Sequence, residues 1–166
     1  NGTGIQTFNT TPAYDIRRAA LDTSGRLYLT GTTANDIFLA RFDAAGALDT
    51  PFGGGGVVTR DQSGDQDEGH GVTVDPATGI VYVTGRTAPP LQFPFFIPFW
   101  NAVTLAYNSN GPLNTDFGGT GAVVFNSGGG DSGEAVRLDS SGRIYVAGTF
   151  NTAAPPNVTA DQTLVI

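Results

Sequence analysis

Short runs of alternating apolar and polar residues recur along the chain, each bounded by glycine, proline, asparagine or aspartate. Such alternation, rich in valine, isoleucine, threonine and tyrosine, predicts half-buried β-strands. The clearest set contains four runs, named A to D, at 71–75, 80–84, 102–107 and 122–125. Runs in the same order lie on both sides of this set. The pattern therefore predicts an all-β chain built from repeated groups of antiparallel strands.

An aspartate-to-glycine turn separates run A from run B in each group, at 22–25, 75–79 and 139–142. An aspartate side chain in such a turn accepts bonds from nearby backbone amides, and the glycine adopts positive φ. This position explains why Asp22, Asp75 and Asp139 recur. We therefore assign these three aspartates to structure and not to catalysis.

A second signature precedes run D, at 48–58 and again at 113–124, and residues 1–8 fit its final part. Four antiparallel strands in a unit of roughly 40 to 50 residues are typical of a β-propeller blade. The sequence predicts one repeat array over 1–166, with three four-stranded blades near 1–52, 53–117 and 118–166. The array is expected to be incomplete at both ends.

These motifs resemble two related bacterial families, the delta-60-type repeat and the seven-bladed-propeller-type repeat. The segment 63–75, Ser-Gly-Asp-Gln-Asp-Glu-Gly-His-Gly-Val-Thr-Val-Asp, is similar to the second of them. The resemblance covers nearly the whole chain except 88–100. It implies a propeller architecture and a secreted or cell-surface location, and it supplies no catalytic residues.

The two ends of the array predict strand sharing. Run D at 5–8 has no A, B and C runs before it, and run C at 162–166 has no D run after it. An unpaired sheet edge recruits strands, and head-to-tail pairing yields a ring or a filament. We expect other copies of the chain as partners; the alternative is that the chain is a piece of a longer repeat protein.

An uncharged apolar segment, 88–100, interrupts the second group between runs B and C. Its four prolines exclude a helix or a central strand, so it is expected to be a loop. Four phenylalanines and the only tryptophan favour a subunit contact, although the loop could instead cover its own blade. The predicted assembly interface comprises Ile5, Thr7, Phe8, Phe93, Phe95, Phe96, Phe99, Trp100, Leu164 and Ile166.

Composition narrows the classes of function. Charged residues make up 14% and the formal net charge is -7, which argues against nucleic-acid binding. No apolar run approaches the ~18 residues of a membrane helix. The chain has 0 cysteines, which excludes disulfides and thiolate metal sites. Glycosylation sequons begin at Asn1, Asn9 and Asn157, where sugar could be attached in a secreted protein.

Two groups of residues could carry chemistry. The acidic loop with Asp61, Asp65, Asp67 and Glu68 could bind Ca²⁺, but its spacing fits no standard loop, and a polar turn is the favoured interpretation. No other cofactor is expected. His70, the only histidine, aligns with Arg17 and Glu134 of the other groups. It could belong to an ionic ring that lines a channel, or act as a general base with Glu68 or Glu134.

The sequence therefore predicts a non-enzymatic, extracellular structural protein whose subunits join by strand sharing. A glycan- or peptide-binding propeller module is the alternative, and a propeller hydrolase or lyase is the third possibility.

Overall fold

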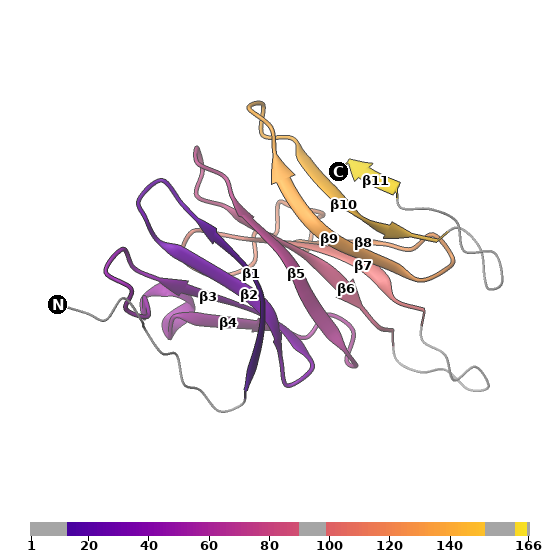
Figure 1. The fold of residues 1–166 in the computed structure, drawn as a ribbon, viewed down its shortest axis with the longest axis horizontal. Coiled ribbons are helices and arrows are strands. Elements are labelled where there is room, and N and C mark those ends of the chain that lie inside the picture. The colour runs from indigo at the N-terminus through magenta and orange to yellow at the C-terminus, as the bar shows by residue number, and fades with distance from the viewer. Residues whose placement is uncertain (1–12, 90–98, 152–161, 166) are drawn as a thin grey trace.

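The computed structural model describes residues 13–89, 99–151 and 162–165, and these residues form three antiparallel sheets (Figure 1). The described residues contain no α-helix, and their one 3₁₀ turn is η1 (Phe52–Gly54). None of their helices is long and apolar enough to cross a membrane. The predicted all-β, antiparallel character is confirmed. The described sheets do not close into a ring.

Sheets 1 and 2 each have four strands in chain order, whereas the described part of sheet 3 has three. Sheet 1 consists of β1 (Tyr14–Leu21), β2 (Leu27–Thr33), β3 (Asp36–Phe42) and β4 (Val57–Arg60). Sheet 2 consists of β5 (Asp67–Val74), β6 (Val81–Thr87), β7 (Asn101–Tyr107) and β8 (Ala122–Phe125). Sheet 3 consists of β9 (Asp131–Leu138), β10 (Ile144–Phe150) and β11 (Gln162–Val165).

The recurring aspartates hold the turn between the first two strands of each sheet. The Oδ1 atom of Asp22 accepts a bond from the Ser24 amide at 2.8 Å, and Asp75 and Asp139 accept the equivalent amide at 2.9 Å. The glycine that ends each turn has φ between 73° and 78°. Both features match the structural role predicted for this turn.

Two hydrophobic clusters join the three sheets face to face. Between sheets 1 and 2 lie fully buried residues such as Tyr28, Leu39 and Leu105. Between sheets 2 and 3, Val136 and Val146 pack against residues of β6 and β7. The first strands of the sheets, β1, β5 and β9, consequently lie side by side, as Figure 1 shows.

A glycine in the second strand of each sheet, at Gly31, Gly85 and Gly148, permits a close backbone approach. A Cβ atom at any of these positions would lie 1.8 to 1.9 Å from a carbonyl oxygen of the first strand. The first strand bulges beside each glycine, leaving one residue outside the register. Because a bulge redirects a side chain, these glycines determine where the inner strands present polar groups.

Candidate functional site

The residues left out of register at the three bulges are Arg17 in β1, His70 in β5 and Glu134 in β9. The sequence aligned these three positions, and the structure places them in one polar cluster along the inner strands. Glu68 and Arg86 of sheet 2 and Ser132 of sheet 3 complete this cluster, which we call the bulge cluster.

His70 lies at the centre of the bulge cluster and is only 8% exposed. Its Nε2 atom lies 3.0 Å from Glu68 Oε2, and its Nδ1 atom lies 3.2 Å from Glu134 Oε1. Arg86 donates to Glu68 Oε1 at 2.9 Å, and Arg17 lies 4.0 Å from the same carboxylate. The three aligned positions therefore meet in an ionic cluster that links residues of all three sheets, whereas the ring lining a channel stays a prediction.

The two carboxylates of this cluster keep their negative charge readily. Burial raises the pKa of Glu68, but hydrogen bonds from Arg86 and His70 outweigh burial and lower the pKa below its usual value. Burial likewise raises the pKa of Glu134, and the Ser132 hydrogen bond and the charge of His70 outweigh it and lower the pKa. Each carboxylate is thus stabilised by groups that surround it.

The arrangement of Ser132 argues against nucleophilic catalysis. A serine nucleophile donates its proton to the histidine base. Ser132 Oγ lies 3.2 Å from His70 Nδ1, but it donates to Glu134 Oε1 at 2.6 Å. Ser132 as a whole is also only 8% exposed. The cluster thus uses its serine, histidine and glutamates for contacts with one another, and these contacts tie the inner strands together.

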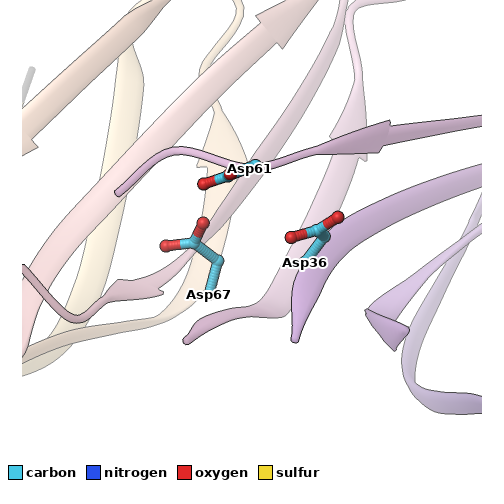
Figure 2. Close-up of side chains that lie close together, drawn as sticks. All are labelled: Asp36, Asp61 and Asp67. Atoms are coloured by element: carbon cyan, nitrogen blue, oxygen red, sulfur yellow. The ribbon is translucent and has the colours of Figure 1, made fainter. Parts of the chain in front are cut away.

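The predicted acidic loop is only partly assembled in the structure. Asp61 and Asp67 lie together with Asp36, with carboxylate oxygens within 4.8 Å of one another (Figure 2). Asp65 is outside this group, and Glu68 is paired with His70 and Arg86. Burial raises the pKa of Asp36, and the charges of Asp61 and Asp67 raise it further. We call Asp36, Asp61 and Asp67 the acidic triad.

Sequence reasoning missed Asp36 and Ser132. Asp36 lies at the start of β3, and the fold brings it beside two residues that follow it by 25 and 31 positions. Ser132 lies two residues before Glu134 on β9 and donates a hydrogen bond to its carboxylate. The sequence did contain a sign of Asp36. This residue begins β3, which pairs with β4, and Asp61 directly follows the end of β4 at Arg60.

Most of the predicted assembly interface lies outside the described residues, as do all three sequons. This holds for Ile5, Thr7, Phe8, Phe93, Phe95, Phe96, Ile166, Asn1, Asn9 and Asn157. Leu164 lies in β11, opposite Val146 in the β10–β11 register. Its interface role stays a prediction.

The described ends of the apolar segment lie between β6 and β7, as predicted. Phe99 is 41% exposed, whereas Trp100 packs under the Arg86 guanidinium, which lies 4.1 Å from its ring centroid. The carbonyl oxygen of Trp100 also accepts a bond from the Asp131 amide at 2.7 Å. Trp100 thus has contacts within its own chain.

A polar depression of 350 Å³ lies between the aspartate turns of sheets 1 and 2. Side chains and backbone of 22–24, 74–79 and 109 form most of its lining. It contains no aromatic side chain, and the Asp22 carboxylate in it is bonded to Arg26 at 2.6 Å.

No protein-family model fits this chain, and no curated protein is significantly similar to it. The resemblance to bacterial propeller repeats therefore stays a prediction.

Proposed function

We propose that this protein is a non-enzymatic, extracellular structural protein built of propeller-type blades, and that its third sheet is completed by a strand from a second copy of the chain. The observation that carries the proposal is the difference between the sheets. In sheets 1 and 2 the third strand pairs with a fourth, β4 or β8, whereas β11 pairs only with β10 among the described residues.

An outer edge of this kind has a defined chemical requirement. A strand edge without a partner presents backbone amide and carbonyl groups that a further strand satisfies. The fourth strands of the other sheets have the sequences Val-Val-Thr-Arg and Ala-Val-Val-Phe. The run Ile-Gln-Thr-Phe at 5–8 is similar to them in its alternation and follows the same glycine-rich signature. It is the donor strand in this proposal.

Two further features support a structural role. The junctions between successive sheets repeat the same backbone bond, from the Asp67 amide to the Asn35 carbonyl and from the Asp131 amide to the Trp100 carbonyl, each 2.7 Å long. A repeated junction is what an extensible array requires. The bulge cluster also uses its serine, histidine and glutamates for contacts between sheets.

Deletion of residues 1–8 tests this proposal. We expect the full chain to form higher oligomers in light scattering and the shortened chain to be monomeric, with unchanged circular dichroism. A synthetic peptide of residues 1–12 should bind the shortened chain, and a peptide with the same residues in scrambled order is the control. A full chain that is monomeric at high concentration, or a deletion that leaves the oligomer intact, would contradict strand donation.

The polar depression favours one alternative, a glycan- or peptide-binding module. Its 350 Å³ volume and its hydroxyl and carboxylate groups suit a polar ligand such as a sugar. Binding of the monomeric deletion variant on a glycan array, abolished by Thr78→Val, would favour this function over assembly.

A further inference from the structure

We propose that the acidic triad is a binding site for a hard divalent cation, Ca²⁺, which joins sheet 1 to sheet 2. This inference goes beyond the proposed function and does not depend on it. Asp36 begins β3 and Asp61 follows β4, both in sheet 1, whereas Asp67 begins β5 in sheet 2. Figure 2 shows the three carboxylates directed toward one another across this junction.

The spacing of the carboxylates suits a single ion. Calcium binds oxygen ligands at about 2.4 Å, so two ligands of one ion lie at most about 4.8 Å apart. The three carboxylates have oxygen atoms that lie within 4.8 Å of one another. The separations are therefore of the size expected for oxygen atoms that share one calcium ion.

The charge balance of the acidic triad also points to a cation. Elsewhere among the described residues, several carboxylates pair with arginine, as in Asp22–Arg26, Asp49–Arg41 and Asp139–Arg143. No ion pair joins any member of the acidic triad to a basic residue among the described residues, and Arg60 donates to Gln62 instead. Asp67 is 0% exposed. A buried carboxylate beside two others is costly unless a positive charge compensates it.

An independent observation at Thr87 supports a ligand here. Thr87 lies directly opposite Asp67 in the β5–β6 register, so the two side chains project from the same face of the sheet. Thr87 is 3% exposed, and its hydroxyl oxygen is buried with no hydrogen-bond partner in the described structure. Buried hydroxyls are normally satisfied. A cation beside Asp67, or a water bound to that cation, would satisfy this one.

Calcium suits the site better than magnesium does. The Asp67 carboxylate already accepts bonds from the Gln62 and Ser63 amides and from the Ser63 hydroxyl at 3.0 Å, so its position is fixed. Magnesium requires near-ideal octahedral geometry at about 2.0 to 2.1 Å, whereas calcium accepts irregular sets of six to eight oxygens. The exposed Asp61 leaves room for water to complete such a set.

Calorimetric titration of the chelator-treated full chain with CaCl₂ tests the site. We expect one equivalent to bind with a Kd on the order of 10⁻⁴ to 10⁻³ M, as in extracellular calcium modules, and MgCl₂ to bind at least about tenfold more weakly. The Asp36→Asn, Asp61→Asn double variant keeps the side-chain shapes and should weaken calcium binding at least about tenfold. Thr87→Val should weaken it several-fold, and the exposed Asp116→Asn is the matched control.

The same samples are followed by thermal unfolding. Calcium should raise the melting temperature of the wild type and of Asp116→Asn, but not that of the double variant. No heat and no shift in melting temperature with 10 mM CaCl₂ would overturn the proposal. So would equal calcium affinity in the wild type and the double variant, because binding would then lie elsewhere on the acidic surface.

Discussion

The junction between sheets 1 and 2 and the junction between sheets 2 and 3 share one backbone design but differ in charge. In both, the aspartate that begins the next sheet, Asp67 or Asp131, accepts bonds from backbone amides of the preceding loop. In both, its own amide donates to the hairpin of the previous sheet. The frame of the junction is therefore encoded by one aspartate and by backbone bonds.

The side chains around that frame differ between the two junctions. Asp36 in the first junction corresponds to Asn101 in the second, because β3 begins at Asp36 and β7 begins at Asn101. Asp61 corresponds to Asn126, because these residues directly follow β4 and β8. The first junction thus has three carboxylates and the second has one. In the bulge cluster, by contrast, opposite charges face each other across both pairs of sheets, Arg17 with Glu68 and His70 with Glu134. A repeated fold can therefore hold its sheets together in electrostatically different ways.

The largest expected effect comes from removing the shared aspartate. Asp67→Ala leaves the Gln62 and Ser63 amides without their acceptor, and Asp131→Ala does the same to Ser127 and Asn151. Each lost acceptor costs about 1 to 3 kcal/mol. We expect each variant to lose about 2 to 4 kcal/mol of unfolding free energy in urea, measured with chelator present.

The exposed Asp116→Ala is the control for these two variants, and it should change stability by less than about 0.5 kcal/mol. A loss confined to only one of the two junction variants would show that the junctions do not share their frame.

A smaller effect is expected when the second junction is given the charges of the first. The Asn101→Asp, Asn126→Asp double variant creates three carboxylates around the Asp131 position. The Oδ1 atom of Asn101 is buried without a hydrogen-bond partner among the described residues, so a charge there is poorly solvated. We expect a loss of about 1 to 2 kcal/mol in chelator, measured by urea unfolding.

Calcium should restore part of the lost unfolding free energy if the backbone frame of the junction is sufficient to position three carboxylates around one ion. Asn114→Asp, also a turn residue of sheet 2 but away from the junction, controls for the added charge. Recovery by calcium in this control as well would mean that the ion acts on overall charge and not at the junction.

The sequence predicted the repeated frame more accurately than it predicted the contacts. Strand β8 has the bounds of the predicted D run, 122–125, because a short alternating run between turns allows one register. Strand β5 begins at Asp67, four residues before the predicted 71, because its first residues are polar or glycine and pair with β6 around a bulge. Local alternation carries no sign of such a bulge.

The candidate sites were harder to predict because they join residues from different sheets. Alignment of the repeats gave Arg17, His70 and Glu134 equivalent positions. The bulges in the first strands, each beside a glycine of the second strand, explain why these side chains meet. Asp36 entered the acidic triad only through the stacking of sheet 1 on sheet 2. Repeat alignment therefore finds equivalent positions, whereas partners across a junction require the packing of whole sheets.

The smallest expected effects are opposite pH dependences at the two junctions. The pKa of Glu134 is lowered in the folded chain, so its contribution to stability is present above its ordinary value of 4.5 and is lost as the pH falls through the folded pKa. The pKa of Asp36 is raised, so its contribution is favourable below its ordinary value of 3.8 and is lost as the pH rises through the folded pKa. Acid should therefore weaken the contact between sheets 2 and 3 and reduce the repulsion between carboxylates at the first junction.

Two neutral variants separate these contributions in urea unfolding between pH 3 and pH 7 in chelator. Glu134→Gln should lose about 0.5 kcal/mol at pH 7 and nothing at pH 3, because the half-exposed carboxylate is screened by solvent. Asp36→Asn should gain about 0.5 kcal/mol at pH 7, where it removes repulsion, and the gain should vanish at pH 3. The double variant should show both changes added together, since the sites lie at different junctions. Two curves that shift in the same direction would show that overall charge, and not the local partners of each carboxylate, sets the pH dependence of the junctions.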